Sequence, residues 1–173
     1  MAKRVAEEVG CLPGTVVGHR VRFDDNTDKS TRIMYATDGM LLREATSDPL
    51  LSRYGVVVLD EAHERSLQTD ILFGVVKRAM EARNTARVDD TASEEEESPD
   101  NLIRRLLRRK SQQLGLPPIK VVVMSATLDI DTFKTFFPQS TLIKIPGRQH
   151  PVQIVYTKHP QEVSDELEWN SQL

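Results

Sequence analysis

Two adjacent carboxylates and a histidine follow a short apolar run near the middle of the chain. The run is Val56–Leu59, and Asp60, Glu61 and His63 come after it. Because three of its four residues are β-branched, the run predicts a strand buried on both faces, as in a parallel sheet. Ligands of open α/β sheets bind beyond the carboxyl ends of the strands, where these polar groups would lie. An aspartate there is suited to hold Mg²⁺ through water, and the next carboxylate to activate a water molecule that attacks a phosphate.

A second apolar run predicts a neighbouring strand. Residues 119–124 form this run, which ends in Ser125, Ala126 and Thr127. Small hydroxyl residues at the carboxyl end of a strand could hydrogen-bond catalytic groups of the adjacent strand, or they could cap the next helix. The two carboxylates of the first run, taken alone, also fit an ordinary strand-to-loop transition, because short motif matches arise by chance. The spacing by itself leaves these alternatives open.

The first of two further segments with nucleic-acid-contacting residue types lies near the start of the chain. Residues 15–23 predict a strand that runs into a turn at 24–26 and carries Arg22 and Phe23 near its end. An arginine there could pair with a phosphate, and a phenylalanine could stack on a base. The alternative is a solvated arginine beside a phenylalanine of the core.

The second such segment is Thr37, Asp38 and Gly39, which separates a predicted strand at 31–36 from a predicted helix at 40–45. Thr37 or Asp38 could cap that helix, which is the common role of such residues. The exposed amides of the first helical turn would also form an anion site suited to a nucleic-acid phosphate.

The remaining periodicity predicts the elements that position these groups. A helix at 2–9 would end at Gly10, and an amphipathic helix over 71–80, capped by Thr69 or Asp70, would pack on the sheet. A further helix is predicted to turn Phe133, Phe136 and Phe137 to the core. Two short strands are predicted at 142–145 and 151–156. These elements together predict an α/β fold with a parallel sheet and flanking helices.

Residues 83–118 interrupt this pattern as a charged insertion. Seven acidic and no basic residues occur from Asp89 to Asp100, so this block is expected to be disordered. A short basic amphipathic helix is predicted at 101–110. It fits a solvated helix docked by its leucines, a nuclear-import signal or an RNA-binding appendage.

Composition limits the class of protein. The 173 residues are 39% hydrophobic and 28% charged, with a net charge of −3, which is typical of a soluble globular protein without a global signature for a polyanion. The single cysteine, Cys11, suits a reducing compartment. No apolar run approaches the roughly 20 residues needed to span a bilayer, and the start lacks a signal-peptide core, so no membrane partner is expected.

Taken together, these segments resemble the first RecA-like domain of DEAH-box ATP-dependent RNA helicases. The resemblance covers residues 2–82 and 117–158. It rests on four motifs that occur in the order of the family, namely Thr37-Asp38-Gly39-Met40-Leu41, Asp60-Glu61-Ala62-His63-Glu64-Arg65, Ser125-Ala126-Thr127 and Pro146-Gly147-Arg148.

The resemblance implies a role for each matching residue. Asp60 would hold Mg²⁺ through water and Glu61 would activate the hydrolytic water, so both would belong to the ATP site. His63 would contact the coupling motif Ser125, Ala126 and Thr127. The RNA sugar-phosphate backbone would be contacted by Arg22, Phe23, Thr37, Asp38 and Gly39. The family uses ATP and Mg²⁺ and moves along single-stranded RNA from 3′ to 5′, and an activator protein is an expected partner.

One motif of the family does not occur in the sequence. A Gly-x-x-x-x-Gly-Lys-Ser/Thr phosphate loop is not found among the 173 residues. We therefore expect a RecA-like domain truncated at the N-terminus over residues 1–158, with 159–173 as a polar tail that starts a linker. The isolated chain is expected to be inactive, and its location nuclear or nucleolar, otherwise cytoplasmic. The alternatives are a non-catalytic RNA- or protein-binding remnant of the fold and a related DNA helicase.

Overall fold

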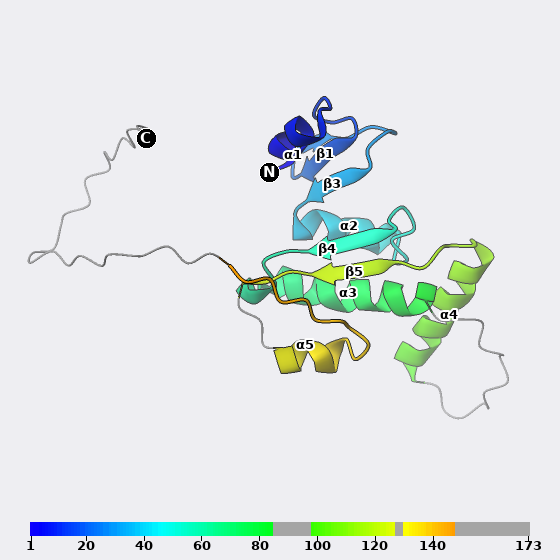
Figure 1. Ribbon diagram of the computed structural model, residues 1–173. Coiled ribbons are helices and arrows are strands. Elements are labelled where there is room, and N and C mark those ends of the chain that lie inside the picture. The colour runs from blue at the N-terminus through cyan, green and yellow to red at the C-terminus, as the bar shows by residue number, and fades with distance from the viewer. Residues whose placement is uncertain (85–97, 127–129, 148–173) are drawn as a thin grey trace, which may run out of the picture. The chain divides into compact units, whose positions relative to one another are not determined.

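The computed structural model describes residues 1–84, 98–126 and 130–147 (Figure 1). The chain divides after Gln139 into two units, which are described separately. The elements, all in the first unit, are α1 (Ala2–Val9), β1 (Val17–Val21), β2 (Asp24–Asn26), β3 (Ile33–Ala36), α2 (Asp38–Ser47), β4 (Val56–Leu59), the 3₁₀ turn η1 (Ala62–Glu64), α3 (Leu67–Asn84), α4 (Pro99–Gln113), β5 (Lys120–Val123) and α5 (Ile130–Phe136).

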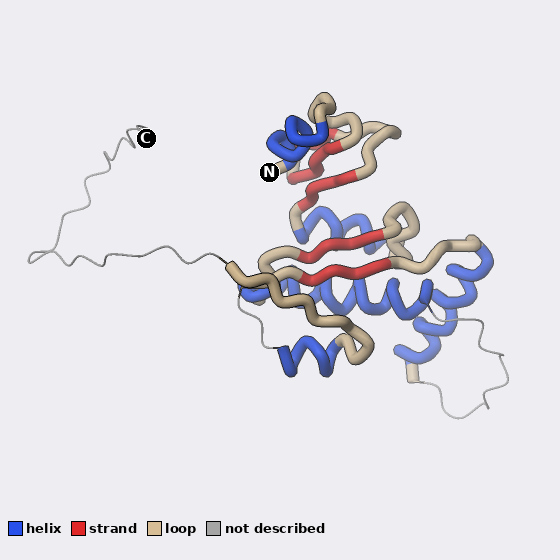
Figure 2. The backbone as a smooth tube through the Cα atoms, in the orientation of Figure 1, coloured by secondary structure: helices blue, strands red, loops and turns tan. Residues whose placement is uncertain are grey.

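The centre of the first unit is the parallel pair β4 and β5 (Figure 2). Val57 and Leu59 of β4 point to one face, where the buried side chains Leu72, Phe73 and Val76 of α3 cover them. The expected strands and the helix that packs on them are thus present. This mixed α/β arrangement is compatible with a partial RecA-like fold.

The prediction that β4 is buried on both faces was wrong. Val56 and Val58 are 53% and 52% exposed, and Val122 of β5 lies exposed on the same face. Within the described ranges, the two-stranded sheet is covered by helix on one face only, and the other strands form a separate three-stranded sheet. One face of this uninterrupted apolar strand is therefore exposed to water.

The separate sheet has the strand order β2-β1-β3, with β1 parallel to β3 and antiparallel to β2. Helix α1 packs beside β1 and ends as predicted at Gly10, whose φ of 74° is left-handed. The predicted turn at 24–26 was wrong, because these residues form β2. The chain turns earlier, at Arg22 and Phe23, since Phe23 adopts a left-handed φ of 67°.

Helix α3 is longer at both ends than the predicted 71–80. It begins after Ser66, whose hydroxyl accepts the Thr69 amide at 3.1 Å, so Ser66 rather than Thr69 or Asp70 caps the helix. It ends at Asn84, and so contains two residues that the sequence placed in the insertion. Of these, Arg83 donates to the carbonyls of Leu51 at 2.8 Å and Pro117 at 2.7 Å.

The helix predicted at 101–110 spans Pro99–Gln113 as α4. Ser98 caps it, and Leu107 is buried against Leu50 and Ala82, so the helix is docked on the fold through one leucine. The acidic block was expected to be disordered up to Asp100, but Asp100 lies inside α4. Ser98 and Pro99 of that block are the cap and the first residue of the same helix, and residues 89–97 lie outside the described residues.

Helix α5 supplies part of the aromatic core. Phe133 and Phe137 meet Phe73 edge to face, with ring centroids 5.4 and 6.4 Å apart. Phe136, expected in the core, is partly exposed under the ammonium group of Lys77.

In the second unit, residues 140–147 adopt no regular secondary structure, so the strand predicted at 142–145 was wrong. Its Ile143 and Ile145 are exposed. The second predicted strand, Arg148 and the polar tail lie outside the described residues.

Candidate functional site

The acidic loop, residues 60–65, follows β4 and is fastened to the end of β5. Ala62 is buried, and its amide donates to the carbonyl oxygen of Met124 at 3.0 Å. The Met124 amide in turn donates to the Leu59 carbonyl oxygen at 2.8 Å. Because Ser125 follows Met124, the two motif segments predicted to meet at the carboxyl edge of the sheet are neighbours. Ser125 is half-buried and Ala126 exposed, while Thr127 lies outside the described residues.

The acidic loop has an unusual backbone. Glu61 and Arg65 both adopt left-handed conformations, with φ values of 51° and 48°. Residues other than glycine seldom take this conformation, which costs of order 1 kcal/mol each. The Glu61 amide donates to Oδ1 of its neighbour Asp60 at 2.9 Å, and Nδ1 of His63 lies 3.4 Å from a Glu61 carboxylate oxygen. The turn thus groups the side chains of Asp60, Glu61 and His63, the three candidates, at one strand end.

This group fits one half of a Mg²⁺–nucleotide site. Asp60 and Glu61 are exposed at the carboxyl end of a parallel strand, and carboxylates are the ligands that hydrated Mg²⁺ takes in proteins. Among the residues that the structure describes, no set of three His, Cys, Asp or Glu side chains converges into a closed metal site. The sequence also has no phosphate loop, so these residues could orient a hydrated ion and water but not cradle the phosphates.

The hairpin tip between β1 and β2 is the first of the segments predicted to contact RNA. Phe23 is 94% exposed, and the guanidinium carbon of Arg22 lies 4.9 Å from its ring centroid. The alternative of a core phenylalanine was therefore wrong. An exposed ring with a cation on it presents a stacking surface and a charge to solvent.

The start of α2 is the second such segment. Thr37 occupies the N-cap position with an extended backbone, and its side chain makes no capping hydrogen bond. The Asp38 carboxylate accepts a hydrogen bond from the buried hydroxyl of Thr69 at 2.6 Å. Neither residue caps α2 through its side chain, so no side-chain cap occupies the anion-binding side of its first turn.

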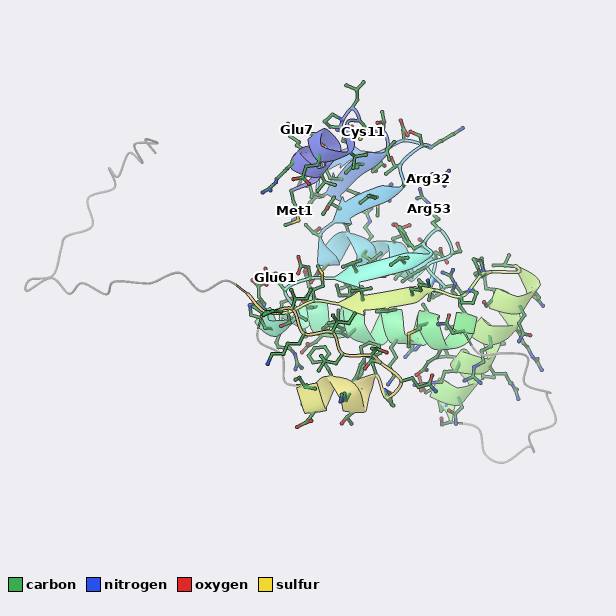
Figure 3. The ribbon with its side chains drawn as sticks, viewed as in Figure 1. Met1, Glu7, Cys11, Arg32, Arg53 and Glu61 are labelled. Atoms are coloured by element: carbon green, nitrogen blue, oxygen red, sulfur yellow. The ribbon has the colours of Figure 1, made fainter. Side chains whose placement is uncertain are left out.

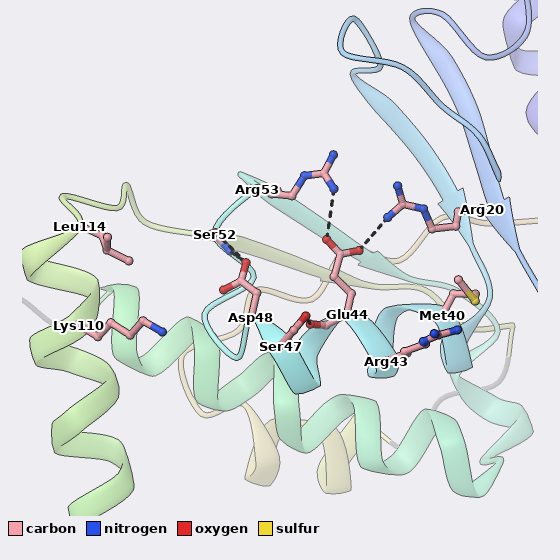
Figure 4. Close-up of a pocket in the computed structure, with 10 residues that line it drawn as sticks. All are labelled: Arg20, Met40, Arg43, Glu44, Ser47, Asp48, Ser52, Arg53, Lys110 and Leu114. Carbon is pink, nitrogen blue, oxygen red and sulfur yellow. Dashed lines mark hydrogen bonds and ion pairs between the residues drawn. The ribbon is translucent and has the colours of Figure 1, made fainter.

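Sequence reasoning missed a polar cluster around Glu44, whose members come from β1, α2 and the loop before β4 (Figure 4). Its carboxylate accepts from the hydroxyl of Tyr54 at 2.7 Å and lies 3.3 Å from Arg20 and 3.8 Å from Arg53. Burial, and then the bond to Glu44, raise the pKa of Tyr54. No sequence signal short of the contact itself marks these four residues as partners.

A cavity of about 580 Å³ adjoins this cluster, with a lining of Arg20, Met40, Arg43, Glu44, Ser47, Asp48, Ser52, Arg53, Lys110 and Leu114. It lies along the C-terminal half of α2. Figure 3 labels Arg53 and Glu61, which precede and follow β4 and therefore lie at its two ends. The cavity is thus remote from the acidic loop. No helix in the described ranges is long and apolar enough to cross a bilayer.

Comparison with known proteins places these motifs in context. No protein-family model matches the chain. Three curated relatives match over 93–94% of it: the ATP-dependent RNA helicase DHX33 of Mus musculus at 45% identity, the pre-mRNA-splicing factor ATP-dependent RNA helicase prp22 of Schizosaccharomyces pombe at 43%, and the pre-mRNA-splicing factor ATP-dependent RNA helicase DEAH10 of Arabidopsis thaliana at 41%. The chain spans only 19%, 11% and 24% of their respective lengths.

These identities extend over more than 160 aligned residues in each case. The resemblance seen in the motifs is therefore confirmed: over nearly its whole length, the chain is a relative of the DEAH-box ATP-dependent RNA helicases.

Proposed function

We propose that the chain is part of an ATP-dependent RNA helicase that couples ATP hydrolysis to movement along single-stranded RNA from 3′ to 5′. The observation that carries the proposal is the carboxylate pair Asp60 and Glu61 at the carboxyl end of β4, hydrogen-bonded through Ala62 to the segment that follows β5. Relatives named as ATP-dependent RNA helicases support the ATP and RNA assignments.

At the nucleotide side, ATP and Mg²⁺ would supply the phosphoryl group and its charge neutralisation. Asp60 would hold the hydrated ion, and Glu61 would orient and deprotonate water. His63, 3.4 Å from Glu61, would hold that carboxylate in place and face the coupling motif Ser125–Thr127. Since these residues provide no phosphate cradle, we propose that the 173-residue chain alone hydrolyses no ATP.

At the RNA side, Phe23 would stack on a base while Arg22 pairs with a phosphate. Thr37, Asp38 and Gly39 would present the amides at the start of α2 to the next phosphate. A nuclear or nucleolar location and an activator protein complete the proposal, which draws on the splicing role stated in the names of two relatives.

A chimera tests the catalytic side. The chain would replace the matching segment of the Mus musculus relative, with which it shares 45% identity over 162 residues. We expect RNA-stimulated ATP hydrolysis by the chimera, and a loss of about 10²-fold or more in Glu61→Gln, because the general base is removed. Glu7→Gln, on the exposed face of α1, is the matched control and is expected to be silent. Equal turnover of the Glu61→Gln chimera would refute the assignment.

The RNA side is tested on the chain itself, with a fluorescent single-stranded oligonucleotide and anisotropy. Phe23→Ala is expected to cost about 1–3 kcal/mol of binding through lost stacking. Arg22→Ala is expected to lower the slope of log affinity against log salt by about 1. Binding without ATPase activity in the chimera would favour the second candidate, a non-catalytic RNA-binding module. Equal affinity for the DNA oligonucleotide of the same sequence would favour a DNA helicase.

A further inference from the structure

The start of α2 and the start of α3 are joined by a partly buried side-chain hydrogen bond. The Thr69 hydroxyl, in a residue only 7% exposed, donates to Oδ2 of Asp38 at 2.6 Å. A hydrogen bond to an ionised acceptor is shorter and stronger than a neutral one, and burial shields it from competing water. The bond therefore fixes two segments 31 residues apart in sequence.

A second contact lies beside the first. A methyl group added at Gly39 would meet the side-chain oxygen of Gln68 at 3.4 Å, so the first turns of the two helices are in van der Waals reach. Asp38 also lies in the first turn of α2 and bonds to the first turn of α3. Its negative charge is favoured by the positive ends of both helix dipoles. The Asp38 carboxylate is thus already engaged by the start of α3.

The bond is continuous with the acidic loop. The hydroxyl groups of Thr69 and Ser66 are hydrogen-bonded to each other at 2.6 Å, and the Thr69 amide donates to the same Ser66 oxygen. Ser66 follows Arg65, the left-handed residue that closes the acidic loop, and Arg65 is held by two bonds to Asp70 at 2.7 and 3.1 Å. A displacement of Asp38 would therefore reach the end of the acidic loop through the hydrogen bonds that link Asp38 to Thr69 and Thr69 to Ser66.

We propose that Thr69 is a positioning residue that couples RNA binding at the start of α2 to the conformation of the acidic loop. This inference rests on the proposed function, because it presumes that residues 37–39 contact RNA. The hydrogen bond between Thr69 and Asp38 links the segment that would bind a phosphate to the turn that orients Glu61. The backbone amide of Asp38 would then meet the phosphate, while its side chain passes the contact on to Thr69.

Hydrogen exchange measured by mass spectrometry tests this on the 173-residue chain with a single-stranded oligonucleotide. RNA is expected to slow amide exchange in a peptide spanning residues 60–70 by about fivefold or more, the low end of usual coupling energies. Thr69→Val is expected to abolish that slowing while the RNA dissociation constant changes much less, and Thr69→Ser is expected to restore it. A purely structural role would alter exchange without RNA and leave the RNA-dependent difference in place.

Two further variants keep the test decisive. Asp38→Asn weakens the bond from its other end, so at saturating RNA it should also abolish the RNA-dependent slowing in residues 60–70, and the double variant should lose no more of that slowing than either single one. Thr46→Val on α2 is the matched control, because that hydroxyl donates within its own helix, to the Leu42 carbonyl. If RNA binds but exchange in 60–70 is unchanged, or if Thr69→Val retains the slowing, the coupling is refuted and RNA binding stands. If no RNA binds, the proposed function itself fails and the inference falls with it.

Discussion

At the scale of single residues, one guanidinium holds three segments together. Arg83, only 5% exposed, donates to the backbone carbonyls of Leu51, Tyr54 and Pro117 at distances of 2.7–2.9 Å. Its burial lowers its pKa from the ordinary range of arginine. The carbonyls that it satisfies lie before β4 and before β5, so the residue aligns the starts of the two strands that carry the candidate site.

Replacing Arg83 by methionine keeps the aliphatic stem and removes the side-chain donor. The Leu51 carbonyl still accepts the Tyr54 amide at 3.0 Å, whereas the Tyr54 and Pro117 carbonyls lose the guanidinium. Each buried unsatisfied group costs about 1–3 kcal/mol, so we expect a loss of at least about 2 kcal/mol in the free energy of unfolding. Urea denaturation followed by circular dichroism measures it. Arg78→Met on the same helix is the control and should stay within about 0.5 kcal/mol, because its ion pair with Asp100 is exposed. Equal stability of the two variants would contradict this account of Arg83.

Tyr54 supplies a second prediction at this scale. Burial and its bond to Glu44 raise its pKa above the ordinary value of 10.0. As pH rises past 10, the unfolded chain therefore loses this proton before the folded chain does. The contribution of Tyr54 to the free energy of unfolding is thus fully present below pH 10 and is lost as the pH rises further. Tyr54→Phe should weaken that alkaline decline. Ultraviolet titration of the three tyrosines should show one that ionises late in the parent and is missing in the variant. A titration curve that the substitution leaves unchanged in its late phase would rule this out.

These residues also mark what the sequence could and could not predict. Asp60, Glu61 and His63 were located from type and spacing, because a strand end is readable from an apolar run. Arg83 and Glu44 were not, because nothing local distinguishes a buried charged residue from a solvated one. Their partners, backbone carbonyls in one case and a tyrosine ten residues away in the other, exist only in the folded chain.

At the scale of elements, the two faces of β4 differ sharply although their side chains are alike. Val57 is buried against α3, whereas Val58, its neighbour in sequence, is half exposed. The apolar run at 56–59 predicts the strand and its parallel partner, but it also predicts burial on both faces. Hydrophobic pattern records what a strand can bury; whether a covering layer is present depends on other segments.

The two valines allow a matched comparison within one strand. Val57→Thr places a hydroxyl in the core and is expected to cost about 1–3 kcal/mol of unfolding free energy. Val58→Thr makes the same change on the bare face, the face of β4 that carries the exposed Val56 and Val58. It should change the free energy of unfolding by less than about 0.5 kcal/mol and reduce self-association of the chain. Denaturation and sedimentation velocity measure the two effects. Similar destabilisation by both would mean that the second face is covered in solution.

At the scale of the whole molecule, charge and the bare face act together. The net charge is −3 at pH 7 and the isoelectric point is about 5.8. Repulsion between copies is then weakest near pH 5.8, where exposed apolar side chains meet with least opposition. Light scattering across pH 5–8 should therefore show the most association near pH 5.8. In Val58→Thr that maximum should be lower, and a flat profile in the parent chain would count against the bare face as the cause.

The pairing of Val56 with Lys120 has a further consequence, for how the gene can vary. Two strands so distant in sequence close a long loop on folding, and the entropy of closing a flexible loop grows only with the logarithm of its length. Even a doubling adds only about 0.6 kcal/mol. A change in the length of the connection between Asn84 and Ser98 is therefore expected to cost little free energy of folding, since Arg83 fastens α3 and Leu107 docks α4 on the fold independently of it. Evolution can rewrite that connection, and an engineer can splice a reporter there, while strand register and acidic loop stay as they are.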